Sequence, residues 1–270
     1  MNSTPASTYG ASDGAAYERF LGRWTRLLAE PLLDFAAAPI EGDLLDVGCG
    51  TGSLAFAMKQ RWPHRRVVGV DIARPYIDHA RSAARASTPE FEVADAMNLP
   101  MADRGFALAA SQLALNFVTD PDRALAEMRR VVRSGGVIVA AVWDFRGGLV
   151  FQRLLWDTAA GVDAAAGAAR DRLFSHRLTL PDGLLDLFRR GGLAAVTRAS
   201  LTIRMEYANF DDYWTPLLGG QGPFGGFVSS LATEQRLRIQ ELVRAAYLSG
   251  APDGPRSFAA TAWAVRGLVP

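Results

Sequence analysis

The fold of this chain is decided by the stretch Leu44-Leu45-Asp46-Val47-Gly48-Cys49-Gly50-Thr51-Gly52-Ser53. The apolar residues at its start predict a short buried strand, and the three alternate glycines that follow end that strand. A helical pattern begins directly afterwards, at Leu54. A strand, a turn without side chains and the start of a helix together predict a pocket lined by backbone N–H groups, which a ligand can approach closely.

An acid at the end of this strand restricts the kind of ligand. The spacing of Gly50, Gly52 and Ala55 formally matches the dinucleotide fingerprint, which places a pyrophosphate on a helix N-terminus. The Asp46 carboxylate would repel a pyrophosphate, whereas it would attract an amine or a sulfonium. The sequence therefore favours a cationic nucleoside ligand, and a dinucleotide-dependent oxidoreductase is the less favoured alternative.

Two further strands are predicted to lead into an acid. The apolar run 67–70 leads into Asp71, which follows the last glycine of the turn by 19 residues, the spacing that places a carboxylate beside ribose hydroxyls. The run 91–93 is followed closely by Asp95. Because parallel strands end at one edge of a sheet, we expect Asp46 and these two acids to surround one cleft. The alternatives are a helix cap for Asp71 and a simple turn acid for Asp95.

Residues 44–142 resemble the class I S-adenosylmethionine-dependent methyltransferases, in particular the group that contains the ubiquinone and menaquinone biosynthesis C-methyltransferases. The residues from Asp46 to Gly52 have the Asp-x-Gly-x-Gly-x-Gly pattern of the family's first motif, and Asp95 stands where the second motif has an acid. The turn 133–136 is similar to the family's Pro-Gly-Gly turn, with a serine where proline is usual. The resemblance implies a methyltransferase whose cofactor is S-adenosylmethionine.

The resemblance also implies roles for single residues around this cofactor. The first motif would wrap the methionine end, and Asp95 would accept from the adenine amino group. Apolar residues at helical spacing from Tyr17 to Leu28 predict an N-terminal helix. This helix either packs on the domain or covers the site, where Tyr17 and Arg23 could meet the methionine carboxylate. The predicted cofactor-binding residues are Tyr17, Arg23, Asp46, Gly48, Cys49, Gly50, Asp71, Ile72, Asp95, Ala96, Met97, Ser111 and Gln112.

The fold that the resemblance implies is α/β, a doubly wound and mostly parallel seven-stranded sheet with an antiparallel last strand and helical cap insertions. Residues 1–13 are expected to be a disordered tail and residues 14–270 a single methyltransferase domain. We expect the N-terminal helix and the inserts 147–178 and 207–255 to form a cap around an apolar acceptor. For the aromatic residues of the second insert, a satellite core or a dimer interface is the alternative.

Methyl transfer is an in-line displacement at a carbon that the cofactor already activates, so the protein has to orient the reactants and exclude water. A base is needed only where the acceptor must lose a proton. Of the three histidines, only His176 of the expected cap is a candidate base, and we predict no catalytic residue. Asn116, Trp143 and His176 are the predicted contacts of a small, partly apolar acceptor. The methylated atom is left open, and a non-catalytic S-adenosylmethionine-binding protein is the alternative function.

Composition restricts the partners, metal sites and cellular locations that the sequence predicts. The chain has 29 basic and 28 acidic residues, so its charge predicts no nucleic-acid partner. Cys49 is the only cysteine, which excludes an intrachain disulfide and a cysteine-based metal site. No apolar run approaches the ~18 residues of a membrane span, and residues 1–14 lack the pattern of a signal peptide. The sequence therefore predicts a soluble, cytoplasmic protein with a small-molecule substrate and no membrane span, and an oligomer is possible.

Overall fold

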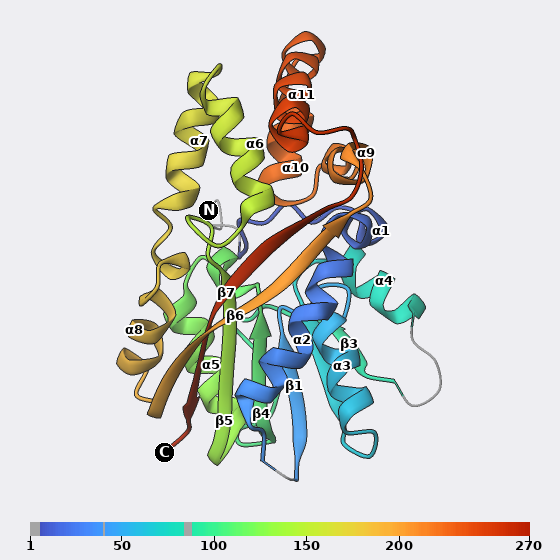
Figure 1. The fold of residues 1–270 in the computed structure, drawn as a ribbon. Helices are drawn as coiled ribbons and strands as arrows, with labels where there is room; N and C mark the ends of the chain where they lie inside the picture. Colours follow the sequence, from blue (N-terminus) through green and yellow to red (C-terminus); the bar gives the residue numbers. More distant parts are fainter. Residues whose placement is uncertain (1–5, 40, 84–87) are drawn as a thin grey trace, which may run out of the picture.

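A computed structural model describes residues 6–39, 41–83 and 88–270, and its centre is a seven-stranded sheet (Figure 1). The strands are β1 (Asp43–Val47), β2 (Val67–Asp71), β3 (Glu90–Val93), β4 (Phe106–Gln112), β5 (Val132–Trp143), β6 (Ala194–Tyr207) and β7 (Arg256–Leu268). They lie in the order β3-β2-β1-β4-β5-β7-β6. The first five strands are parallel, and β7 runs antiparallel between β5 and β6. This confirms the predicted sheet.

Helices cover both faces of the sheet because its strands direct alternate apolar residues to opposite sides. The helices are α1 (Gly14–Tyr17), η1 (Glu18–Gly22), α2 (Arg23–Ala36), α3 (Ser53–Arg61), α4 (Arg74–Ala83), η2 (Leu115–Phe117), α5 (Pro121–Val131), α6 (Val150–Ala160), α7 (Ala164–Phe174), η3 (Arg177–Thr179), α8 (Gly183–Arg190), α9 (Phe210–Trp214), η4 (Thr215–Gly219), α10 (Gly222–Ser230) and α11 (Thr233–Leu248). Leu44 of β1 shares an apolar cluster with α2, α3 and α4. Its neighbour Leu45 belongs to a second cluster with α5 and α8.

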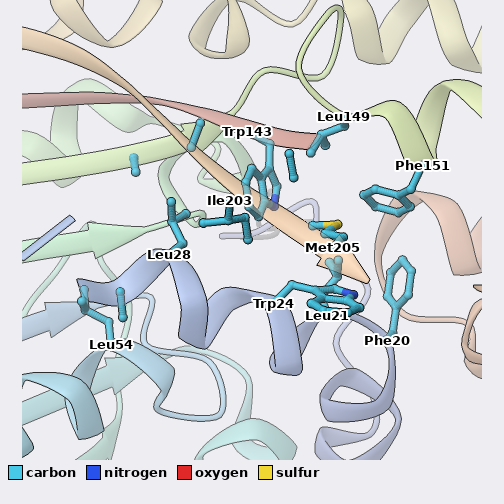
Figure 2. Close-up of a cluster of buried hydrophobic side chains, with 14 of the residues drawn as sticks. Phe20, Leu21, Trp24, Leu28, Leu54, Trp143, Leu149, Phe151, Ile203 and Met205 are labelled. Carbon is cyan, nitrogen blue, oxygen red and sulfur yellow. The ribbon is translucent and has the colours of Figure 1, made fainter. Parts of the chain in front are cut away.

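A group of buried side chains fastens α2 to the sheet (Figure 2). Trp24 and Leu28 of α2 lie near Ile203 and Met205 of β6, and Trp143 at the end of β5 belongs to the same cluster. Each of these five side chains is less than a tenth exposed. Burial of a side chain of this kind is worth roughly 1.5–3 kcal/mol. The cluster therefore fixes α2, and with it the residues that precede α2, relative to the carboxyl ends of the strands.

A further layer of helices stands beyond the carboxyl ends of the strands, at the top of Figure 1. There α6 packs against α7 and α11, and α10 packs against η4. These helices come from the two predicted inserts, and Phe210, Tyr213 and Trp214 of the second insert are almost fully buried against one another and Tyr247. Those aromatic residues thus build a core within this layer. Over the residues that the structure describes, no helix combines the length and apolar character that a membrane crossing requires.

The first described residues, 6–13, run across the carboxyl edge of the sheet, and we call them the strap. The Thr8 N–H donates to the Phe117 carbonyl at 2.9 Å, and the Gly222 N–H donates to the Gly10 carbonyl at 3.2 Å. These hydrogen bonds fall in the segment for which the sequence predicts a disordered tail, and that prediction stays untested. Phe117 and Gly222 lie more than 100 positions further along the sequence, so the small, polar composition of the strap could not reveal these two partners. Residues 1–5 of the predicted tail lie outside the described residues.

Candidate active site

The turn after β1 has a backbone that suits glycine. The φ angles are +73° at Gly48, +56° at Gly50 and +95° at Gly52, all in the left-handed region that glycine adopts without strain. A Cβ on Gly48 would lie 2.3 Å from the Cβ of Ala114, and one on Gly52 would lie 2.8 Å from the ring of Phe56. The turn therefore needs glycine both for its conformation and for its close packing. It leaves the backbone open to a ligand at the start of α3.

One cavity opens at this turn, and three acids line it. Asp46 comes from β1, Asp71 from the end of β2, and Asp95 from the residues just after β3. The structure thus brings together the three carboxylates that the sequence predicts at one cleft. They lie at the carboxyl edge of the parallel strands, where open α/β sheets bind their ligands.

Asp46 is completely buried, and within the described chain neither of its carboxylate oxygens has a hydrogen-bond partner. Burial raises the pKa of this carboxyl to about 8; the nearby Ala55 N–H, which does not reach hydrogen-bond geometry, offsets part of this effect, and the neighbouring Asp71 raises the pKa further. Gln112 at the end of β4 donates its Nε2 to the Thr25 carbonyl, whereas its Oε1 meets no donor among the residues described. Unmatched buried acceptors are costly. This corner of the cavity therefore suits a ligand that carries N–H donors or a positive charge.

Asp71 holds the glycine turn through its carboxylate. Its Oδ2 accepts the Gly50 N–H at 2.9 Å, and its Oδ1 accepts the Ala73 N–H at 2.8 Å. Burial raises the pKa of Asp71, and these N–H groups partly offset that effect. Asp95 is fixed in a similar way, because its Oδ1 accepts the Met97 N–H at 2.8 Å. A carboxylate oxygen has two lone pairs, so each of these acids can still accept a hydrogen bond from a ligand.

The N-terminal helices are fastened across the glycine turn. A π turn, η1, separates α1 from α2, and such turns are frequent at functional sites. The Glu18 carboxylate accepts the Thr51 hydroxyl at 2.5 Å, and the hydroxyls of Thr25 and Ser53 are 2.9 Å apart. These contacts hold the N-terminal helices over the site and leave Tyr17 in the lining of the cavity.

Most of the predicted site residues lie in the lining of this cavity, and their roles there stay predictions. The lining contains Tyr17, Asp46, Gly48, Cys49, Gly50, Asp71, Ile72, Asp95, Ala96, Gln112 and Trp143. Outside it lie Arg23, Met97, Ser111, Asn116 and His176.

Arg23 is held away from the cavity by other partners. Its guanidinium donates to the Asp212 carboxylate at 2.8 Å and lies 4.3 Å from the centre of the Trp24 ring. Asp212 belongs to α9, 189 residues further along the chain. The structure therefore does not support Arg23 as the partner of a cofactor carboxylate.

The other residues outside the lining also have identifiable surroundings. Ser111 and Asn116 are buried, with exposed fractions of 0% and 4%. Met97 contributes its backbone N–H to Asp95 rather than its side chain to the cavity. His176 is exposed between α7 and η3. The only candidate base of the sequence thus lies apart from the cavity.

The sequence did not single out most of the aromatic side chains that line the cavity. We call Tyr9, Phe117, Trp143, Phe145 and Phe224 the aromatic wall. Ring centroids are 4.8 Å apart for Tyr9 and Phe117, 6.4 Å for Phe117 and Phe145, and 6.2 Å for Phe145 and Phe224. The wall joins the strap, the ends of β4 and β5, and α10. For Phe224, the crowding of aromatic residues in the second insert was a signal in the sequence. No such signal exists in the sequence for Tyr9, Phe117 or Phe145.

Gln221, at the start of α10, ties the strap to the cavity wall. Its Oε1 accepts the Tyr76 hydroxyl at 3.0 Å and the Ser12 N–H at 3.2 Å, and its Nε2 donates to the Ser12 hydroxyl at 2.9 Å. The side chain is 1% exposed. One amide thus connects three separate segments around the cavity.

We expect Gln221→Leu to lower the free energy of unfolding by about 2–4 kcal/mol, because it leaves several buried polar groups without partners. Urea unfolding measures this loss. Gln60→Leu is the matched control, since Gln60 is exposed on α3. Equal stability of the two variants would show that Gln221 does not fasten the strap.

Comparisons with known proteins identify the family. The family described as "Methyltransferase domain" matches residues 45–140. A malonyl-[acyl-carrier protein] O-methyltransferase of Geobacter sulfurreducens is 33% identical over 189 residues, which cover 69% of this chain and 68% of that protein. The chain belongs to the S-adenosylmethionine-dependent methyltransferases. A demethylmenaquinone methyltransferase of Thermus thermophilus is 37% identical over 119 residues, covering 43% of this methyltransferase and 52% of the relative. The implied family, activity and cofactor are thereby confirmed.

The comparisons also show how far the likeness extends. This methyltransferase covers only 38% and 47% of two further relatives with the same printed name as the Geobacter protein. A solved structure described as a putative methyltransferase from Bacillus halodurans has a TM-score of 0.58 and 18% identity, covering 90% of this chain and 98% of that one. At that identity the likeness concerns the fold. The family assignment sets aside the dinucleotide-dependent oxidoreductase that the glycine spacing alone left open.

Proposed function

We propose that this methyltransferase acts on a small, partly apolar acceptor bound between the aromatic wall and the acids. The position of the aromatic wall carries this proposal. Trp143 ends β5, Phe145 lies just after it and Phe117 follows β4, whereas Asp71 ends β2 and Asp95 follows β3. In the strand order, β1 separates the strands of these two groups. The cavity therefore has an acidic end and an aromatic end, as expected for two ligands of different character.

The acidic end fits the cofactor. S-Adenosylmethionine, when bound, supplies a methyl group on a positively charged sulfur. We assign the unmatched oxygens of Asp46 and Gln112 to its positive and N–H-bearing groups, Asp71 to the ribose hydroxyls, and Asp95 with the Ala96 N–H to the adenine. These residues would hold the cofactor, and the buried, unmatched acceptors of this corner are the observation that supports the assignment.

The aromatic end would orient the acceptor and exclude water. The strap and α10 close over this end, with Phe224 less than a tenth exposed. Exclusion of water and alignment of the reacting atoms account for much of the acceleration of a displacement. We extend the proposal to the two inserts, whose helices together with the N-terminal helices would form the cap of a single domain 14–270.

Two measurements test this function. Calorimetry should show micromolar binding of S-adenosylmethionine and of S-adenosylhomocysteine, and mass spectrometry of the denatured protein should identify either compound if it co-purifies. A screen of apolar acceptors should then release S-adenosylhomocysteine. Absence of cofactor binding contradicts the proposal. Cofactor binding without turnover across a broad panel would favour the non-catalytic binding protein instead.

A further inference from the structure

The described lining of the cavity has acidic side chains but no basic one, although the site has to receive a second ligand beside the cofactor. Among the described residues that line it, the charged side chains are Asp46, Asp71 and Asp95. The lining contains no lysine, arginine or histidine within the described ranges. Arg23, the basic residue that the sequence offered, is engaged by Asp212 outside the lining. An anionic acceptor would therefore meet acidic side chains and no basic one in this lining, and the cofactor sulfonium would be its only counter-charge.

The aromatic end also lacks a group that could remove a proton from the acceptor. Of the polar lining groups, the Tyr9 hydroxyl belongs to the aromatic wall and the Gln112 amide ends the adjacent β4. Burial raises the pKa of Tyr9 well above its usual value, so this phenol does not ionise near neutral pH. An amide is not a base in water. His176 is exposed outside the cavity. An acceptor that must first lose a proton, such as a phenol, has no general base in the wall.

We infer that the acceptor atom is the nitrogen of an amine that is uncharged near neutral pH, such as an arylamine, carried on an apolar or aromatic body. This inference rests on the proposed function and adds the class of its acceptor. The nitrogen lone pair forms the new N–C bond while the S–C bond breaks, and the electron pair of that bond stays on sulfur. The positive charge moves from sulfur to nitrogen, and any proton on the product ammonium leaves later to solvent. The number of charges in the cavity is unchanged throughout.

The aromatic wall suits the positive charge that develops on the acceptor nitrogen. Ring faces attract ammonium groups, most strongly where water is excluded. Trp143, Phe145 and Phe224 are 5%, 2% and 3% exposed and line one end of the cavity. A carboxylate acceptor would instead lose its water shell against these rings. The malonyl group named for the Geobacter relative carries such a carboxylate, so we expect this chain to differ from that relative in its acceptor.

A matched set of acceptors tests the inference on the wild-type protein. We expect 4-ethylaniline or its N-methyl derivative, whose nitrogen is uncharged near neutral pH, to release S-adenosylhomocysteine and to gain one methyl group by mass spectrometry. We expect 3-phenylpropanoate and 4-ethylphenol, which are similar in size, to remain unmodified. Methylation of the carboxylate or the phenol in preference to both amines overturns the inference, and so does the absence of amine methylation in protein that binds the cofactor. Failure to bind S-adenosylmethionine is a different result, which contradicts the proposed function itself.

A binding measurement supplies a readout that does not depend on turnover. Protein saturated with S-adenosylhomocysteine should bind trimethyl(2-phenylethyl)ammonium at least ~10-fold more tightly than its neutral carbon isostere, because the ring faces favour the cation. Phe224→Leu should reduce this preference several-fold. Phe227→Leu on the same helix should leave it unchanged, since Phe227 packs on Trp156 outside the lining. Equal binding of the cation and the isostere by the wild-type protein would refute a cation-accepting wall, and unchanged S-adenosylhomocysteine affinity shows that each variant is folded.

Discussion

Asp71→Ala should weaken the binding of S-adenosylmethionine at least ~100-fold. A hydrogen bond to a charged group contributes about 1.5–3 kcal/mol, so the loss of two bonds to ribose hydroxyls corresponds to a factor of 100 or more. The same carboxylate accepts the N–H groups of Gly50 and Ala73. Its removal therefore also releases the glycine turn that the cofactor has to fit. Calorimetric titration with S-adenosylmethionine and S-adenosylhomocysteine measures both losses, which should be similar because the two compounds share the ribose.

Two further variants separate the effect of the carboxylate from a general loss of structure. Asp71→Asn keeps the size of the side chain but has only one acceptor oxygen, so we expect an intermediate affinity. Asp78→Ala removes an exposed acid of the next helix and should bind the cofactor like the wild type. If Asp71→Ala bound S-adenosylmethionine within a few-fold of Asp78→Ala, the assignment of Asp71 to the ribose would be wrong.

The sheet and the cofactor end of the site could be predicted because their determinants are local. The strand, glycine turn and helix around Asp46 lie within one short stretch, the strand before Asp71 is an apolar run, and the short strand with Phe91 and Val93 closely precedes Asp95. Parallel strands end at one edge of the sheet, so local patterns were sufficient to place three distant acids together. The described lining contains all three.

The acceptor end could not be predicted in the same way because its determinants are long-range. Arg23 could bind a ligand carboxylate, but its guanidinium donates to Asp212 of α9. No local sequence pattern connects α9 with α2. Tyr9 lies in a segment whose small, polar residues indicate disorder, and its position depends on Phe117 and Gly222. A single sequence shows neither partner. Side chains at this end are placed by tertiary packing rather than by residue spacing.

Asp46 connects the stability of the fold with the binding of the cofactor. Its pKa in the folded protein is about 8, because burial disfavours the ionised form. The ordinary value is near 4, so between about pH 4 and pH 8 the folded chain holds a proton that the unfolded chain has lost. Asp46 therefore does not lower the free energy of unfolding below about pH 4, and it lowers that free energy increasingly as the pH rises towards 8. The raised pKa of Asp71 acts in the same direction.

Asp46→Asn should make the cofactor-free protein more stable at pH 8 while leaving its stability near pH 4 almost unchanged. One pKa unit corresponds to ~1.4 kcal/mol, so the gain at pH 8 is roughly 5 kcal/mol at most. The slope of the unfolding free energy against pH should become shallower without vanishing, because Asp71 remains. Urea unfolding at several pH values measures the change, with the exposed Asp78→Asn as the control. A variant whose slope matched that of the wild type would show that Asp46 is already ionised in the folded protein.

The same substitution should weaken the binding of S-adenosylmethionine, by an expected factor of about 10–100, because a neutral amide no longer attracts its positive groups. In the wild-type protein at pH 7, Asp46 is mostly protonated, and a cationic ligand would favour its ionised form. Binding should then release close to one proton, which calorimetry in two buffers of different ionisation enthalpy detects. Asp46→Asn should release much less. The variant lacks only the carboxyl group that should ionise on binding. Equal proton release by the wild type and by Asp46→Asn would therefore place the positive groups of the cofactor away from Asp46.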